Sequence, residues 1–148
     1  CGVDVGPNGD VYVADTWNHR IQQFSPEGKY VREWSVGFYG PRGVAVAPDG
    51  AVFVADTGNN RIFRFSADGK QERTWGAPGK APGTFIEAMG LTADAAGNVY
   101  VVDNGNGRLQ AFSRDGQFLF EFPVPGWESK VFSEPDVAID ADGRIWVT

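Results

Sequence analysis

The chain is poor in the residues that build most catalytic and metal centres. Its 148 residues include one cysteine, one histidine and one methionine. A single cysteine cannot form a disulfide within the chain, so cysteine usage leaves the redox compartment undetermined. No GxSxG, HExxH or paired-cysteine motif occurs either, so the sequence lacks the usual signatures of hydrolases and zinc sites.

Long apolar runs and clustered positive charges are also missing. No stretch of about 18 consecutive apolar residues occurs, so we expect no membrane insertion by this segment. The net charge is −6 and the arginines are scattered along the chain, whereas a nucleic-acid-binding face needs clustered Lys and Arg. We therefore expect no nucleic acid among the partners.

Repetition is what the sequence has in abundance. The segment VYVADTWNHRIQQFS at 11–25 is matched by VFVADTGNNRIFRFS at 52–66 and by VYVVDNGNGRLQAFS at 99–113. The repeat starts are 41, 47 and 46 residues apart, and a fourth start begins at Asp136. Self-similarity at such periods is typical of repeat architectures. The chain divides into repeats 2–42, 43–89 and 90–135 and a partial repeat 136–148.

Each repeat contains four short runs rich in β-branched and aromatic residues, separated by Asn-Gly or Asp-Gly turns and a polar loop, which is the pattern of strands joined by hairpins. In the second repeat these runs cover 43–46, 52–55, 61–66 and 71–75. The second run of each repeat is apolar at consecutive positions, which indicates burial on both faces. The sequence thus predicts an all-β fold, a β-propeller fragment of radially stacked, four-stranded antiparallel blades. We expect Gly28, Gly69 and Gly116 in turns between third and fourth strands.

The stretches GVAVAPDGAVFVADTGNNRIFRFSADGK at 43–70 and ADTWNHRIQQFSPEGK at 14–29 resemble NHL repeats. The resemblance covers essentially the whole chain and implies one NHL-type propeller fragment over residues 1–148. Because the family usually forms six-bladed propellers, the chain would be about half of one. Such a fragment is expected to self-associate or to pack against the remaining blades of a parent chain, since its end blades would expose apolar faces.

Three aspartates recur at the end of each second strand, each followed by an asparagine after three residues and an arginine after five. They are Asp15, Asp56 and Asp103, with Asn18, Asn59 and Asn106 and with Arg20, Arg61 and Arg108. Because this unit repeats with the fold, we expect each carboxylate to accept hydrogen bonds from its loop or from its arginine. His19 has Asn60 and Gly107 as counterparts, and the resemblance favours a loop-packing role for it.

Ligand-binding residues are expected where the repeats differ. The loops between second and third strands share one face with the interblade loops 35–42, 76–89 and 123–135, while short glycine turns form the opposite face. The predicted ligand-binding residues on the loop face are Trp17, His19, Phe38, Tyr39, Arg42, Glu87, Trp127, Glu134 and Asp136. Phe38, Tyr39, Trp127 and Phe132 either cap the barrel mouth or contact a partner. Phe85 is expected in the core, and Arg42, Met89, Pro135 and Asp136 are expected to ring the axial opening.

The resemblance leaves two functional classes open. One is a non-catalytic binding propeller, part of a larger sensor or scaffold protein, that binds a protein or a small-molecule ligand. The other is half of a propeller enzyme, either a metal-dependent lyase resembling the peptide-amidating lyase or a lactonase-like enzyme. That lyase holds zinc with several histidines, so we assign no catalytic residue, no metal ligand and no cofactor. Bacterial relatives with similar repeats often sit in extracytoplasmic parts of larger proteins, which favours that location.

Calcium is the metal that the residue inventory leaves open, because it needs only carboxylates and carbonyls. Four aspartates are expected on first strands, nearest the propeller axis: Asp4, Asp94, Asp136 and Asp140.

Overall fold

Each complete repeat folds into one four-stranded antiparallel sheet. The computed structural model describes residues 2–127 and 135–148. Blade 1 contains β1 (Val3–Val5), β2 (Val11–Asp15), β3 (Arg20–Phe24) and β4 (Tyr30–Trp34). Blade 2 contains β5 (Gly43–Val46), β6 (Val52–Asp56), β7 (Arg61–Phe65) and β8 (Gln71–Trp75). Blade 3 contains β9 (Ala88–Ala93), β10 (Val99–Asp103), β11 (Arg108–Phe112) and β12 (Phe118–Pro123). Strands pair in chain order within each blade. The predicted all-β propeller-fragment fold is confirmed.

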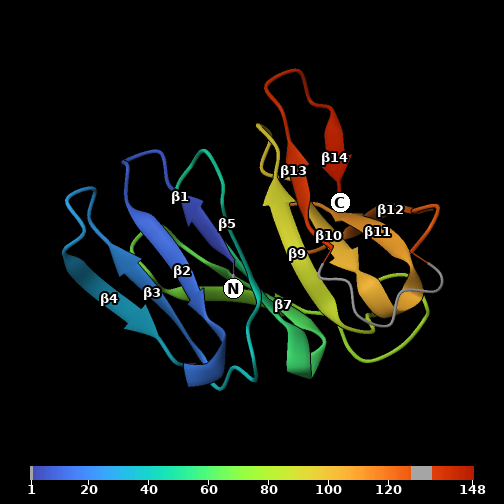
Figure 1. Cartoon of the computed structure of the whole chain (residues 1–148), viewed down its shortest axis with the longest axis horizontal. Helices are drawn as coiled ribbons and strands as arrows, with labels where there is room; N and C mark the ends of the chain where they lie inside the picture. Colours follow the sequence, from blue (N-terminus) through green and yellow to red (C-terminus); the bar gives the residue numbers. More distant parts are fainter. Residues whose placement is uncertain (1, 128–134) are drawn as a thin grey trace.

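A fourth, two-stranded sheet follows blade 3. Strands β13 (Val137–Ile139) and β14 (Ile145–Val147) form a hairpin, which we call blade 4. The first strands of successive blades are neighbours, β1 beside β5, β5 beside β9 and β9 beside β13. Figure 1 shows β4 and β12, the outermost strands of blades 1 and 3, at opposite sides of the molecule. The blades therefore fan out from their first strands.

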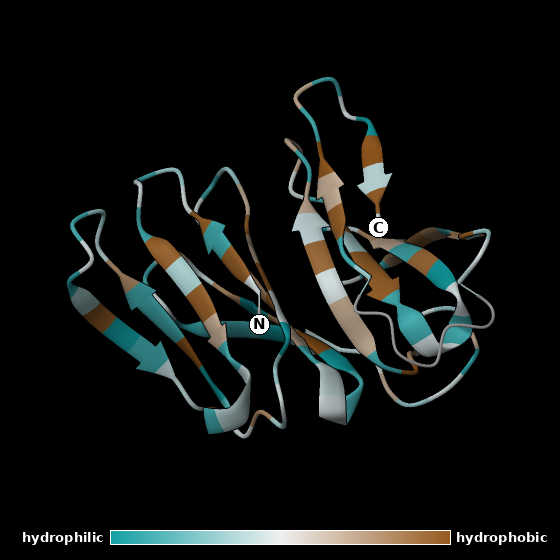
Figure 2. Cartoon of the chain, viewed as in Figure 1, coloured by the Kyte–Doolittle hydropathy of each residue, from teal (hydrophilic) through white to brown (hydrophobic). Residues whose placement is uncertain are grey.

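The hydrophobic core lies between blades, because each sheet buries one face against the next sheet. One cluster joins blades 1 and 2 through Tyr12, Ala14, Val44 and Val54, among others. A second cluster joins blades 2 and 3, and a third joins blade 3 to the hairpin. In Figure 2 the hydrophobic residues lie mainly along the strands, whereas the turns are mostly hydrophilic or neutral.

The turns follow the glycine pattern. Gly28, Gly69 and Gly116 connect third and fourth strands with φ of 76°, 89° and 83°, values at which other residues are strained. The loops between second and third strands are three-residue 3-10 turns, Thr16–Asn18 (η1), Thr57–Asn59 (η2) and Asn104–Asn106 (η3). No helix in the described ranges is long and apolar enough to cross a membrane.

Candidate functional site

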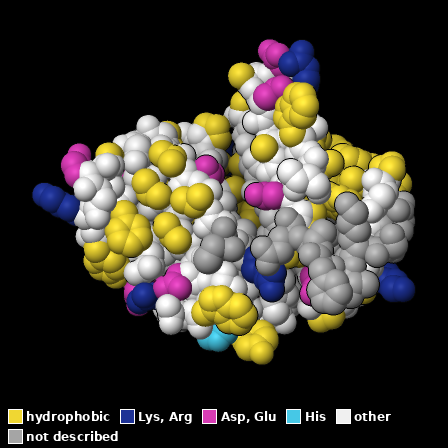
Figure 3. Space-filling view, in the orientation of Figure 1, with side chains coloured by type: hydrophobic (Ala, Val, Ile, Leu, Met, Phe, Trp, Pro, Cys, Tyr) yellow, Lys and Arg dark blue, Asp and Glu magenta, His cyan; other side chains and the backbone are white. Residues whose placement is uncertain are grey.

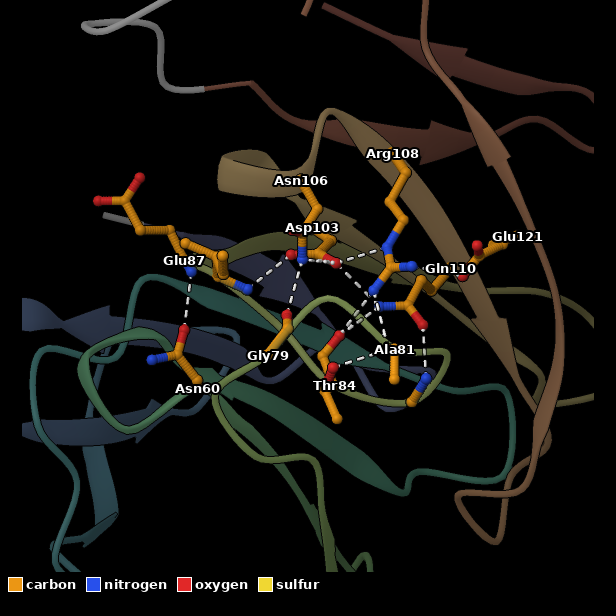
Figure 4. A network of polar contacts seen from close by, with 12 residues as sticks. Asn60, Gly79, Ala81, Thr84, Glu87, Asp103, Asn106, Arg108, Gln110 and Glu121 are labelled. Atoms are coloured by element: carbon orange, nitrogen blue, oxygen red, sulfur yellow. Dashed lines mark hydrogen bonds and ion pairs between the residues drawn. The ribbon is translucent and has the colours of Figure 1, made fainter. Parts of the chain in front are cut away.

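The loop face is built on the repeated Asp, Asn and Arg, and Figure 4 draws their network in blade 3. Arg108 is buried there, whereas Arg20 and Arg61 are each one-third exposed. The Asp103 side chain is fully buried. Its Oδ2 accepts hydrogen bonds from Arg108 Nε at 2.7 Å, Asn106 Nδ2 at 2.8 Å and Gln110 Nε2 at 3.0 Å. Its Oδ1 accepts the backbone N–H of Ile86 at 2.8 Å. The carboxylate thus joins its own loop to the segment that crosses over from blade 2.

The donors around Asp103 also hold the interblade loop 76–89. Arg108 Nη2 donates to the carbonyl oxygens of Ala81 and Thr84, both at 3.0 Å. Gln110 has no exposed surface and its Nε2 donates to Thr84 O at 2.8 Å. Asn106 Nδ2 donates to the Gly79 carbonyl at 2.9 Å. Because buried charge-assisted hydrogen bonds are the strong ones, this loop is fixed to blade 3 along its length.

Blade 2 repeats the arrangement with a shorter crossing segment. Asp56 Oδ2 accepts from Arg61 Nε and Asn59 Nδ2, both at 2.9 Å, and its Oδ1 accepts the N–H of Tyr39 at 2.6 Å. Arg61 also donates to the Gly37 carbonyl at 2.9 Å. The predicted Asp–Arg bonds are confirmed, and the bond from each of these carboxylates to the crossing backbone is an addition that sequence reasoning missed.

In blade 1 the corresponding Asp, Asn and Arg bond to one another and to Glu33, with no crossing segment among their described partners. Asp15 Oδ2 accepts from Arg20 Nε at 2.7 Å, and both carboxylate oxygens accept from Asn18 Nδ2 at 2.9 and 3.0 Å. The hydrogen bond from Arg20, and to a lesser degree that from Asn18, lowers the pKa of Asp15 below its ordinary value despite an opposing desolvation effect. Arg20 Nη1 pairs with Glu33 at 2.8 Å. A mixed-charge patch therefore lies exposed beside η1.

In blades 1 and 2, the residue after the 3-10 turn accepts a hydrogen bond from the crossing segment that leaves the same blade. His19, Asn60 and Gly107 have φ of 54°, 52° and 62°, the left-handed region in which Gly, Asn and His are enriched. His19 Nδ1 accepts the N–H of Gly40 at 2.9 Å, and Asn60 Oδ1 accepts that of Glu87 at 2.7 Å. His19 therefore has a loop-packing position.

Two of the predicted ligand-binding residues, His19 and Tyr39, come together on this scaffold, and a third, Trp17, lies two residues before His19 in the turn η1. The His19 ring stacks on Tyr39 with centroids 5.3 Å apart and an interplanar angle of 21°. Trp17 is 86% exposed and Tyr39 is 62% exposed. We call Trp17, His19 and Tyr39 the aromatic cluster. Figure 3 shows hydrophobic side chains beside the single histidine at the lower edge of the molecule.

Two other predicted aromatic residues lie in the core instead. Phe38 is buried and packs edge-on against Phe63, with ring centroids 5.1 Å apart. Trp127 is buried in the cluster between blade 3 and the hairpin, and its Nε1 donates to the Thr148 carbonyl at 3.2 Å. Contact with a ligand would require exposed surface on these two side chains, and neither has it, because each fills space between sheets. Glu134 lies outside the described residues, as does Phe132.

Glu87 is exposed at the next junction along the loop face. Its carboxylate accepts from Asn104 Nδ2 at 3.0 Å. Phe85, in the same interblade loop, has no exposed surface, which confirms its predicted place in the core. Glu87 thus lies at the junction of blades 2 and 3, whereas the aromatic cluster lies at the junction of blades 1 and 2.

The first strands enclose an axial cleft of about 310 Å³. Its lining includes the four residues expected to ring the axial opening: Arg42, Met89, Pro135 and Asp136. Asp4 also lines it and accepts the N–H of Val46 at 2.7 Å across the junction of blades 1 and 2. The cleft therefore presents charges of both signs.

Two of the four aspartates considered for calcium lie elsewhere. Asp94 and Asp140 accept backbone N–H bonds within the turns between first and second strands, and neither lines the axial cleft. The expectation that they lie nearest the axis is wrong, because each carboxylate closes a turn. Within residues 2–127 and 135–148, no three His, Cys, Asp or Glu side chains are grouped so as to hold a metal ion.

Comparison with known proteins identifies the repeats. The family model described as NHL repeat matches residues 2–24, 38–65 and 85–112, together more than half of the chain. Virginiamycin B lyase from Staphylococcus aureus is 23% identical with a TM-score of 0.77, covering 99% of this chain and 47% of the lyase chain. Hydrazine synthase from Kuenenia stuttgartiensis is 16% identical with a TM-score of 0.74, covering 96% of this chain and 39% of that one. No curated protein sequence matches the chain.

These likenesses concern architecture. At such identities they establish the propeller fold alone, and function has to be argued from the site. The chain spans about half the length of the matched lyase chain.

Proposed function

This chain belongs to the NHL-repeat family, and on that premise we propose that it is a non-catalytic binding module, part of a larger sensor or scaffold protein, that binds a protein or a small ligand on its loop face. One observation carries the proposal: the aromatic cluster exposes Trp17 and Tyr39 on a backbone held by hydrogen bonds. Aromatic side chains dominate binding hot spots because they bury much area at low entropic cost.

The position of the cluster supports a binding role further. Tyr39 N–H is held by Asp56 and Gly40 N–H by His19, so the crossing segment is fixed by blades 2 and 1 at once. Rigid presentation reduces the entropy that association would otherwise cost. The charges of Arg20, Glu33 and Asp15 lie on neighbouring positions of blade 1. A partner with a polar rim around an apolar centre fits this surface.

The opposite face offers little for recognition. Its turns present small and charged residues. Asn8 and Asp68 bond within their own turns, and Asp49 bonds within its turn and pairs with Arg114 of blade 3. An enzymatic alternative would rest on the likeness to virginiamycin B lyase. At 23% identity this likeness supports a shared fold and gives no support for a shared activity. We therefore place binding on the loop face, with Arg42 and Asp136 of the axial cleft and Glu87 as polar contributors.

The face assignment predicts a one-sided loss of binding. A peptide selected from a display library against the wild-type chain serves as the probe, and its dissociation constant is measured by calorimetry. Trp17→Ala with Tyr39→Ala is expected to weaken binding at least tenfold, since a desolvated hot-spot aromatic contributes roughly 2 kcal/mol. The matched set Asn8→Ala, Asp49→Ala and Asp68→Ala is expected to change it less than about twofold.

Both sets replace exposed side chains, so circular dichroism should show intact folds. If the turn-face set weakened the selected peptide more than the loop-face set, the functional face would be the opposite one.

A further inference from the structure

The outer hairpin of blade 2, β7 and β8, carries a pocket of about 290 Å³. Blade 2 lies between two complete four-stranded blades, so the elements that surround this hairpin belong to the described part of the chain. We call the pocket the basic pocket, because most of its lining side chains are positively charged. Its lining residues are Arg64 of β7, Lys70 of the connecting turn, and Gln71, Glu72 and Arg73 of β8.

Strand pairing brings the two arginines of the basic pocket together. Arg64 and Arg73 are directly opposite each other, and the register shifts at the next pair, Phe65 and Gln71. This β-bulge leaves Glu72 as the extra residue of β8, and its carboxylate forms an ion pair with Arg64 Nη1. Like charges directly opposite each other destabilise a sheet, and the pocket supplies one carboxylate for two guanidinium groups.

At the corresponding positions of blade 1, the polar groups satisfy one another. The places of the two arginines are taken by Gln23 and Arg32. Arg32 Nε donates to Gln23 Oε1 at 2.7 Å, and Gln23 Nε2 donates to Asp10 Oδ2 at 2.6 Å. The Arg32 guanidinium also donates to the backbone carbonyls of Ala67 and Asp68 in blade 2. This arginine therefore bonds to its own blade and to the next one.

Blade 2 does not supply such acceptors to its two arginines. Ala51 stands where blade 1 has Asp10. Arg64 Nε is buried and has no hydrogen-bond partner among the described residues. The described part of the chain also provides no hydrogen-bond or ion-pair partner for the exposed Arg73 guanidinium. Because a buried donor without an acceptor is unfavourable, an acceptor from outside the chain would stabilise this arrangement.

The positive charge of the pocket is particular to blade 2. Blade 3 has the same hairpin with the same register shift, but alanine and phenylalanine, Ala111 and Phe120, are the directly opposite pair there. The lysine and the glutamate are replaced by Gln117 and Leu119. The backbone of the hairpin therefore does not require charged residues at these positions, which favours a role in binding for the charges of blade 2.

We propose that the basic pocket binds a phosphate group, carried by a phosphate monoester or by the free phosphate ion. This inference goes beyond the proposed function and uses residues outside the loop face. Two arginines and a lysine supply three positive charges against the single carboxylate of Glu72. A phosphate monoester carries a charge of about −1.5 to −2 at neutral pH, which this excess matches. Guanidinium groups bind phosphate through paired, charge-assisted hydrogen bonds, and a lysine acts as a point charge.

Titration of the chain with inorganic phosphate, followed by two-dimensional ¹H–¹⁵N NMR at constant ionic strength, tests the proposal. The backbone amides of residues 70–73 are expected to shift and to saturate with a dissociation constant of about 1 mM. Arg73→Gln is expected to weaken binding at least about tenfold, and Lys70→Gln about threefold, because each removes a charged donor. Both side chains are exposed, so the folds should survive.

Lys29→Gln and Arg144→Gln are the matched controls, since each removes one exposed positive charge outside the pocket. We expect either control to change the dissociation constant less than about twofold. A peptide that contains one phosphoserine, compared with its unphosphorylated form, identifies the source of the phosphate group. Tighter binding of the phosphopeptide than of inorganic phosphate would indicate a phosphorylated chain, and no tighter binding would indicate a small phosphate compound.

Three results would overturn the proposal. The first is a titration in which neither inorganic phosphate nor the phosphopeptide approaches saturation by about 20 mM. The second is a set of saturating shifts that lie outside the hairpin of blade 2. The third is an Arg73→Gln variant that binds as tightly as the two control variants.

Discussion

Replacing Asp103 by alanine is expected to lower the free energy of unfolding by about 3 kcal/mol, because it removes the buried acceptor of four hydrogen bonds, while Arg108 keeps its ion pair with Glu121. Arg108 would lose its acceptor at Nε, and the N–H of Ile86 would be left without a partner. Gln110 would lose a further acceptor in the buried network. The measurement is urea denaturation followed by tryptophan fluorescence.

Asp15→Ala is the control for this prediction, since Asp15 occupies the equivalent position but is partly exposed and has no crossing segment among its described partners. We expect a loss of about 1 kcal/mol or less, as for an exposed ion pair. Equal losses in the two variants would mean that the bond to the crossing backbone contributes nothing, and that the carboxylate acts only within its own loop.

The blades and their aspartates could be predicted from the sequence because both depend on short-range order. The short apolar runs, the Asn-Gly and Asp-Gly turns and the five-residue spacing from Asp15 to Arg20 are local features that recur with the fold. What the spacing could not reveal is the partner of the second carboxylate oxygen. Tyr39 and Asp56 stand 17 residues apart, as do Ile86 and Asp103, and only the stacking of blades brings them together.

The residues that replace His19 in the other repeats indicate a backbone requirement that the sequence analysis did not identify. A position occupied by His, Asn and Gly in three repeats is one that needs a left-handed backbone, which the φ values show. The same three residues suggest only a loop-packing role until the backbone conformation is known. Trp17 likewise differs from its counterparts Gly58 and Gly105. Only the structure shows that a Cβ at either glycine would clash with the crossing segment, at Tyr39 or Ile86.

The errors at Phe38 and Trp127 have a different cause. Large aromatic residues in irregular loops have no periodicity, so the sequence does not distinguish a side chain that caps a junction from one that faces a ligand. In the structure both are buried, whereas Trp17 and Tyr39 stay exposed. Aromatic residues of the interblade loops therefore have one of two roles. Some fill the space between sheets, and others remain exposed at the surface.

That division of tasks predicts a large difference between two aromatic residues of the interblade loops. Phe85→Ala is expected to cost about 3–5 kcal/mol of unfolding free energy, the usual loss for a buried phenylalanine, which includes the cavity that it leaves. Phe85 has no exposed surface and packs against Phe112 with ring centroids 5.6 Å apart. Tyr39→Ala, at the aromatic cluster, is expected to cost about 1 kcal/mol or less because Tyr39 is 62% exposed.

Denaturant unfolding of both variants checks the difference, and the library-selected peptide supplies a second measurement on the same proteins. Tyr39→Ala should weaken that peptide while leaving stability nearly unchanged. Phe85→Ala should lower stability while the folded fraction still binds, since the aromatic cluster is held by blades 1 and 2. If Tyr39→Ala proved as destabilising as Phe85→Ala, the exposed cluster would be part of the packing between blades, and a loss of binding in that variant would no longer locate the ligand.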